Sequence, residues 1–273
     1  MPLHLDSIMN DKQKNDVFTW VIQECMDGCD SLFVSEDKKY FHIRNNIIDK
    51  LTNKPIGKFI YTLMLGDNVL EIKDIDIVLD NSTPTLLKFN TLREGSSDSN
   101  EYYGVEVVNE GWRLEIETVN RHVIKEDLIG TQREAFVSAF PFELTVYEDI
   151  DAFNNWAGFK APIKIGDTDL LIHGFSPKFT MSGRMFSDDS GTGGNYSFIL
   201  GDVVDFRDVE VTFGEIEVSF VLANLDTSLG VIPVGLSRET FDLRNLKIGS
   251  VIAMNADIKV DLAKDDDFSY TCK

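Results

Sequence analysis

The sequence predicts a β-rich α+β fold: antiparallel sheets with an N-terminal amphipathic helix and a C-terminal Greek-key barrel. Three observations favour this class. Apolar and polar residues alternate over many short segments, which is the period of half-buried strands. Turn residues separate these segments at short intervals. Only one region, near the N-terminus, shows a long helical period.

The chain of 273 residues is acidic throughout. Its 46 Asp and Glu residues exceed its 26 Lys and Arg residues, which gives a formal net charge of −20. Both halves carry the excess, with −12 over residues 1–150 and −8 over residues 151–273. Such a charge repels nucleic acid, whose binding depends on phosphate neutralisation, and attracts positively charged proteins. We therefore predict a basic protein partner and no nucleic acid.

The N-terminus and the cysteines favour a cytoplasmic location. The opening MPLHLDSIMNDKQK lacks the apolar core of a signal peptide. No apolar run approaches the roughly 20 residues that cross a membrane. Three cysteines without framework spacing do not suggest a secreted disulfide scaffold. The sequence predicts no membrane association and leaves the oligomeric state open.

The clearest helix is predicted over residues 10–31. Val17, Val21, Cys25 and Cys29 recur at three- and four-residue spacings and make one apolar stripe. The two cysteines are therefore expected to be core residues, because buried free thiols are common. Their spacing also suits a pair of zinc ligands, and this alternative stays open. The remaining ligands would have to come from Cys272, His4 and His42.

Hairpins are expected to follow the helix. Ile75 and Ile77 alternate with Asp74 and Asp76, which predicts one wet face for that strand. Acidic pairs of this kind are too frequent in the chain to indicate a site. The predicted hairpins cover residues 31–43, 59–79, 103–119 and 161–175.

A domain boundary is predicted near residues 130–138, where the chain is polar. A new strand is expected after Pro141, followed by a short helix over residues 148–159. We therefore divide the chain into an α+β domain, residues 1–137, and a mainly β domain, residues 138–273. No internal repeat at a fixed period is evident.

The pattern after residue 196 predicts consecutive strands. A two-residue turn at Gly214 would place Val209 opposite Phe220 and Val211 opposite Val218, so that apolar residues share one face. Two more strands, with one or two helical turns over residues 238–247 between them, would complete the barrel. Three meander strands, a short helix and a returning strand resemble the OB-fold over about residues 196–262. The resemblance implies a fold and no activity.

The outward face of this barrel is the predicted partner site. The alternation places acidic side chains there, and the four chosen as partner-binding are Glu210, Glu217, Asp257 and Asp261. A non-enzymatic inhibitor or immunity-type role fits, because neutralising a basic protein calls for this charge. No cofactor is predicted.

Two functions from other classes remain as alternatives. The first is a metal-dependent enzyme with a carboxylate-rich site near the 184–195 loop, where Asp188 and Asp189 are weak metal candidates. A concave cluster of Asp side chains with His122 or His173 would favour this alternative. This loop lacks the Lys of a phosphate-binding loop, and the chain lacks a recognisable nucleophile motif. The second is a single-stranded nucleic-acid-binding OB protein, which the charge disfavours.

Overall fold

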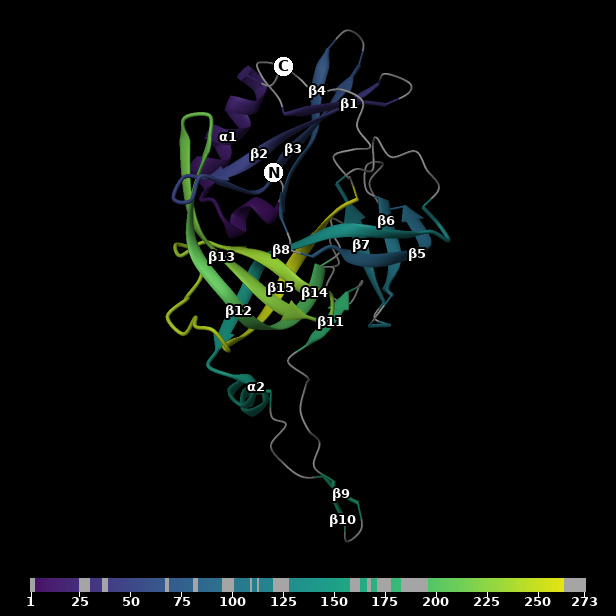
Figure 1. Cartoon of the computed structure of the whole chain (residues 1–273), viewed down its shortest axis with the longest axis vertical. Helices are drawn as coiled ribbons and strands as arrows, with labels where there is room; N and C mark the ends of the chain where they lie inside the picture. The colour runs from purple at the N-terminus through teal and green to yellow at the C-terminus, as the bar shows by residue number, and fades with distance from the viewer. Residues whose placement is uncertain are drawn as a thin grey trace.

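Fifteen strands and three short helices make up the described part of the chain (Figure 1). The computed structural model describes residues 3–24, 30–35, 39–66, 69–80, 83–94, 101–108, 110–111, 113–119, 128–157, 163–165, 168–170, 178–182 and 196–262. The elements are η1 (Leu3–Ser7), α1 (Asp11–Glu24), β1 (Ser31–Val34), β2 (Tyr40–Asp49), β3 (Lys54–Leu65), β4 (Leu70–Leu79), β5 (Thr85–Glu94), β6 (Glu101–Val107), β7 (Arg113–Thr118), β8 (Gln132–Tyr147), α2 (Ile150–Trp156), β9 (Ile163–Ile165), β10 (Thr168–Leu170), β11 (Phe179–Ser182), β12 (Tyr196–Phe213), β13 (Ile216–Thr227), β14 (Gly230–Leu236) and β15 (Val251–Asp261).

The first four strands form an antiparallel sheet in the order β1-β2-β3-β4. The predicted hairpins are confirmed by these pairings, by the β6–β7 pair and by the small β9–β10 pair. The prediction that one face of β4 is exposed to solvent is wrong near the end of the strand, because Asp76 and Val78 are buried. Val78 packs in a small cluster with Val119 and Phe136, so a second layer covers that face.

The large sheet closes into a ring of hydrogen-bonded strands in the order β12-β13-β14-β8-β15, with β15 pairing back to β12. The fifth strand of this ring is β8, which comes from outside the predicted 196–262 segment. β8 is one strand from Gln132 to Tyr147, longer than the strand expected after Pro141. Pro141 is tolerated because it lies at a register shift between β8 and β15. The predicted division at residues 137 and 138 falls inside β8 and stays a prediction.

The same two central strands belong to a second ring, β5-β6-β7-β15-β8, in which β8 pairs back to β5. The four strands β5 to β8 are therefore connected and paired in the same way as the four strands β12 to β15. In each set, three strands meander and the fourth returns to the first. The third strand of each set pairs in parallel with the fourth strand of the other. The fold thus contains a duplicated topology.

The duplication extends to a local irregularity. The β5–β6 pair shifts register between Phe89 and Thr91, and the β12–β13 pair shifts between Val203 and Asp205. Phe89 and Val203 are both buried in the same core cluster, which fills the two rings together. Because each shift follows an inward-facing residue of the first strand in its set, the two sets bend at corresponding places.

The β12–β13 hairpin carries a second core beyond the ring. Its predicted register is confirmed, with Val209 opposite Phe220 and Val211 opposite Val218. These residues pack in one cluster with the four-stranded sheet and with α1. At the tip, Gly214 has φ +62°, and an added Cβ would lie 2.5 Å from Trp20 Nε1. Glycine is therefore required both by the turn and by the close approach of α1.

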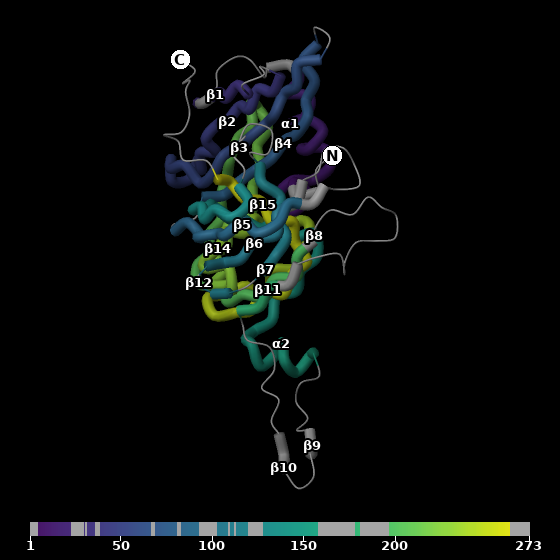
Figure 2. Tube along the Cα trace, turned by 90° about the vertical axis from the view of Figure 1, so that its right-hand side faces the viewer, coloured from purple at the N-terminus to yellow at the C-terminus, as the bar shows by residue number. Residues whose placement is uncertain are grey.

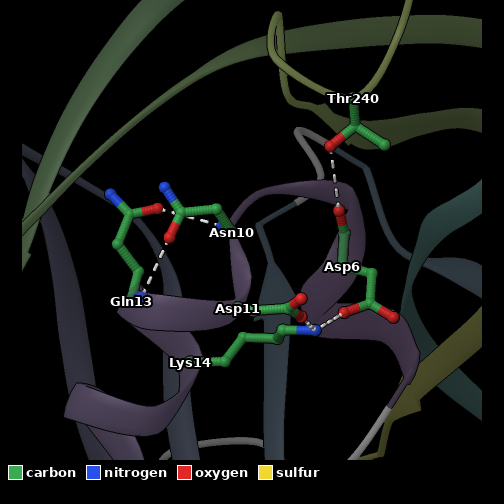
Figure 3. Close-up of polar contacts among 6 residues, drawn as sticks. All are labelled: Asp6, Asn10, Asp11, Gln13, Lys14 and Thr240. Atoms are coloured by element: carbon green, nitrogen blue, oxygen red, sulfur yellow. Dashed lines mark hydrogen bonds and ion pairs between the residues drawn. The ribbon is translucent and has the colours of Figure 1, made fainter.

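Helix α1 is held at its first turn by reciprocal hydrogen bonds (Figure 3). Asn10 Oδ1 accepts from the backbone N–H of Gln13, and Gln13 Oε1 accepts from the backbone N–H of Asn10, both at 3.0 Å. This is a capping box, which satisfies two helix-end donors. Lys14 Nζ lies between Asp6 and Asp11 (Figure 3). Burial lowers the pKa of Lys14, but these hydrogen bonds outweigh burial and raise it overall.

Two of the three predicted helical segments contain a helix in the described residues, α1 and α2. Val17 and Val21 of α1 are buried as expected, whereas Ile22 is exposed. The helical turns expected over residues 238–247 are not a helix. That connection contains hydrogen-bonded turns, of which one joins Phe241 N–H to the carbonyl of Ser237. Within the described residues, no helix has the length and apolar character needed to cross a membrane.

Candidate functional site

Two of the predicted partner-binding residues lie on the exposed side of the β12–β13 hairpin. Glu210 and Glu217 are both exposed. Glu217 Oε1 lies 2.7 Å from Lys50 Nζ, and this hydrogen bond lowers the pKa of Glu217. The backbone N–H of Lys50 also donates to the carbonyl of Glu210 at 2.7 Å, which fixes the turn after β2 beside the hairpin. The face is accessible, but one of its charges is already paired.

The other two predicted residues do not lie on a solvated surface. Asp261 is only 2% exposed and forms a two-point ion pair with Arg44, which is equally buried. Asp257 is partly buried, with its Oδ2 3.3 Å from Lys259 Nζ. The expectation of an open face is wrong here because the four-stranded sheet covers this end of β15.

Lys259 joins three parts of the molecule. Its Nζ lies 3.0 Å from Asp76 Oδ1 on β4, 3.3 Å from Glu117 Oε2 on β7 and 3.3 Å from Asp257 on its own strand. The ammonium and Asp76 are both buried. Sequence reasoning missed this network because alternation predicts which residues share a face, not which element covers that face. We interpret the network as structural.

Several other candidates lie outside the described residues. These are Asp188 and Asp189 with the whole 184–195 loop, and also Cys25, Cys29, Cys272, His122 and His173. The metal-enzyme and zinc alternatives therefore stay predictions. His42 is described and buried, with its Nδ1 3.0 Å from Thr62 Oγ1 and its ring edge-on to Phe33. Within the described part of the chain, no group of three His, Cys, Asp or Glu side chains could hold a metal ion.

A cavity of about 310 Å³ lies where α2 meets the outer face of the β8-β15-β12 strands. We name it the α2 cavity. It is lined by Glu143, Leu144, Thr145, Tyr147, Trp156, Phe198, Ala253, Met254 and Asn255. Register places Thr145 opposite Ala253 and Phe198 opposite Asn255, so these side chains rise from adjacent strands. The small side chain of Ala253 leaves room between its larger neighbours.

Aromatic rings form one wall of the α2 cavity. Trp156 is 72% exposed, while Phe153 of the same helix is buried. The ring centroids of Trp156 and Tyr147 are 5.7 Å apart. Burial raises the pKa of the Tyr147 hydroxyl, which is therefore uncharged at neutral pH. The helix holds Trp156 in place through its N-cap, where Asp149 accepts from the N–H of Ala152.

The polar side of the α2 cavity contains an incomplete hydrogen-bonding group. Asn255 Nδ2 donates to Glu143 Oε2 at 2.9 Å. Asn255 Oδ1 is buried and has no hydrogen-bond partner among the residues that the structure describes. A buried acceptor without a donor costs free energy, so this amide oxygen is a point of strain in the strand beside the cavity.

A second cavity of about 560 Å³ lies over strands β5 to β7. Its lining includes Gly104, which lies between Thr91 and Glu115 on the neighbouring strands and is covered by the Thr91 hydroxyl. Arg113 at its rim already faces Glu106 at 3.8 Å. This cavity combines charges of both signs and favours no ligand class.

No known protein family, no curated protein and no solved structure matches this chain.

Proposed function

We propose that this protein is a non-enzymatic acidic binding protein that recognises a basic protein partner, in an inhibitor or immunity-type role. One observation supports the proposal above the others. The described part of the chain exposes 18 Asp and Glu side chains but only 10 Lys and Arg side chains. The negative charge of the sequence is therefore present at the surface, where it attracts positive partners over long range.

The tip of the β12–β13 hairpin is the proposed contact. Glu210 and Glu215 are exposed there, and neither forms an ion pair with a residue that the structure describes. The hairpin is supported from below by its apolar face and by the contact of Gly214 with Trp20. A supported tip loses little conformational freedom on binding, which favours affinity. Asp257 and Asp261 lie outside the proposed contact, because they are engaged inside the protein.

The ring order supports an OB-like arrangement as the finer description of this region. The meander β12-β13-β14, the returning strand β15 and the parallel neighbour β8 follow an order that such a fold could use. We propose that β8, which precedes the other strands in the chain, takes the place of the fifth strand. The acidic surface still disfavours single-stranded nucleic acid as the partner.

The test is partner capture followed by kinetics. The wild-type protein is used to isolate a partner from a native lysate, and association with the purified partner is measured from about 50 to 500 mM salt. We expect Glu210→Lys with Glu215→Lys to slow association at low salt by about tenfold and to flatten the salt dependence. The matched control is Glu71→Lys on β4, an exposed carboxylate away from the tip. Equal slowing in the control, or no slowing in the double variant, would refute this contact.

A further inference from the structure

The α2 cavity contains an aromatic ring that is held in place and yet largely open to solvent. Trp156 is 72% exposed, although its ring centroid lies 5.7 Å from that of Tyr147 and 6.0 Å from that of Phe153. Phe153 is buried and meets Tyr147 edge-on, with the centroids 5.2 Å apart, so the two supporting rings are fixed themselves. A supported indole with most of its surface in water offers a flat platform for the apolar face of a ligand.

The polar groups of the α2 cavity both donate and accept hydrogen bonds. Glu143 and Thr145 are exposed, and one carboxylate oxygen of Glu143 accepts from Asn255, which leaves the other oxygen as an acceptor. Thr145 and Tyr147 are hydrogen-bonded to each other, so one of these two hydroxyls still has a hydrogen to donate. The indole N–H of Trp156 donates to no residue that the structure describes. The lining therefore matches a ligand whose polar groups do both, and hydroxyl groups are of that kind.

Three other ligand classes fit this lining less well. A purely apolar ligand would cover the polar groups without replacing their hydrogen bonds to water, which costs free energy. An anion would be repelled by Glu143 and by three exposed carboxylates beside the start of α2, namely Glu148, Asp149 and Asp151. A cation has no acceptor for the indole and hydroxyl donors. The volume of about 310 Å³ lies at the lower end of the range for small-molecule sites, which favours a ligand with a single ring.

From these observations we propose that the α2 cavity binds one neutral sugar ring. Its C–H face packs on Trp156, and its hydroxyl groups bond to Glu143 and Thr145. A pyranose has such an apolar face and a rim of hydroxyls that donate and accept. The source of this ring is a free monosaccharide or the terminal sugar of a glycan.

The α2 cavity lies at the end of the molecule opposite α1 and the hairpin tip (Figures 1 and 2). The inference is therefore independent of the proposed hairpin contact, and either can fail alone.

The test is a titration followed by NMR. The three tryptophans of the chain give three indole N–H signals, and Trp156→Ala identifies that of Trp156 by its loss. The probes are glucose, galactose, mannose and N-acetylglucosamine. Sorbitol is a control that has the hydroxyls of glucose without its ring, and cyclohexanol is a control that has a ring with a single hydroxyl.

We expect at least one of the four sugars to shift the Trp156 signal with a dissociation constant of about 1–10 mM, as is reasonable for a ligand of this size. Both controls should bind at least about tenfold more weakly than that sugar, because each lacks one half of the proposed contact. Binding of either control as tight as that of the best sugar would overturn the inference. So would the absence of a shift with all four sugars up to about 50 mM.

Two variants test the platform and the polar rim separately, with the affinity for the best sugar measured by calorimetry. Trp156→Ala should weaken binding by at least about tenfold, and Thr145→Val, which keeps the shape of the side chain, by about threefold to tenfold. Leu51→Ala is the matched control, because it also removes an exposed apolar side chain but lies outside the lining, and it should change the affinity by less than about twofold.

Unchanged affinity in Trp156→Ala or in Thr145→Val would place binding elsewhere and overturn the inference. Since both side chains are exposed, the melting temperatures of these variants should stay close to that of the wild type, which shows that the fold is kept.

The source of the sugar is distinguished by the two methyl glycosides of the best sugar, in which the C1 hydroxyl is blocked as it is in a glycan. A glycoside that binds less than about fivefold more weakly than the free sugar assigns the cavity to the end of a glycan. A greater loss with both the α- and the β-glycoside assigns it to a free monosaccharide, whose C1 hydroxyl is then part of the contact.

Discussion

The buried pair Arg44–Asp261 should be one of the most sensitive points of the fold. We expect Asp261→Ala to lower the free energy of unfolding by about 3–5 kcal/mol. The guanidinium of Arg44 would then lie in the protein interior without this counter-ion, far from the water that solvates it in the unfolded chain. The pair joins β2 of the four-stranded sheet to the last residue of β15, so the loss also weakens the contact between the two sheets.

The size of this effect follows from the geometry. Both side chains are 2% exposed, and both guanidinium end nitrogens face carboxylate oxygens, one of them at 3.2 Å. An exposed pair would contribute only about 0–1 kcal/mol, because water screens it. Since a whole domain is stabilised by about 5–15 kcal/mol, removing this counter-ion of Arg44 would cost a large share of the total stability. An alanine at the exposed Glu210 should change the same quantity by no more than about 0.5 kcal/mol.

Chemical denaturation at pH 7, followed by tryptophan fluorescence, measures this difference. The free energies are extrapolated to water for the wild type, for Asp261→Ala, for Arg44→Met and for the double variant Arg44→Met with Asp261→Leu. The double variant removes both charges and keeps apolar volume, so it should be more stable than either single variant. A cost below about 1 kcal/mol for Asp261→Ala, or a double variant as unstable as the single ones, would refute the argument.

Three further outcomes are expected. Gly214→Ala should destabilise the protein by at least about 1 kcal/mol in equilibrium denaturation, because φ is positive and Trp20 blocks the Cβ; in a Trp20→Ala background the penalty should shrink. Asn10→Ala should cost about 1 kcal/mol in the same assay, because it removes half of the capping box. Burial raises the pKa of Asp49, but hydrogen bonds from Thr52 and Arg207 outweigh burial and hold it below its usual value. The ionised Asp49 carboxylate therefore stabilises the fold above about pH 4, and this stabilisation is lost as the pH falls through the pKa of Asp49 in the folded state. We expect Asp49→Asn to be less stable than the wild type at pH 7, and to lose less stability than the wild type between about pH 5 and pH 2. Denaturation measured at each pH tests this.

The local parts of the fold could be predicted from the sequence because their signals are local. The β12–β13 register follows from a two-residue turn at Gly214 and from the alternation on either side of it. The helices over Asp11–Glu24 and Ile150–Trp156 follow from spacing and from turn residues at their ends. In these cases the residues that determine the structure lie within one element or one turn.

The long-range parts could not be predicted, because alternation does not reveal which surface covers a face. Asp76 and Asp261 occupy positions that alternate like those of Glu210, yet the first two are buried by another sheet. The duplicated topology could not be detected in the sequence either, because the two sets of strands share an order of pairing and not a pattern of side chains. Phe89 and Val203, for example, lie at corresponding bends but differ in size and shape.

The acceptor of the α2 cavity illustrates the same limit. The cavity brings Asn255 of β15 together with Trp156, about 100 residues earlier in the chain, and with Phe198 of β12. An exposed tryptophan beside a buried, unsatisfied amide oxygen becomes apparent only when the strands are placed side by side.

The two rings share β8 and β15, and this has a consequence for how the protein is made. Ala139 pairs with Ile258, about 120 residues further along the chain, so neither ring can close until β15 has been synthesised. While the ribosome produces the intervening residues, β8 has an unpaired edge, and strands with open edges are prone to pair with other chains. Such distant pairings also slow folding. We therefore expect the protein to fold after its synthesis rather than during it, and chains that end before residue 251 to aggregate.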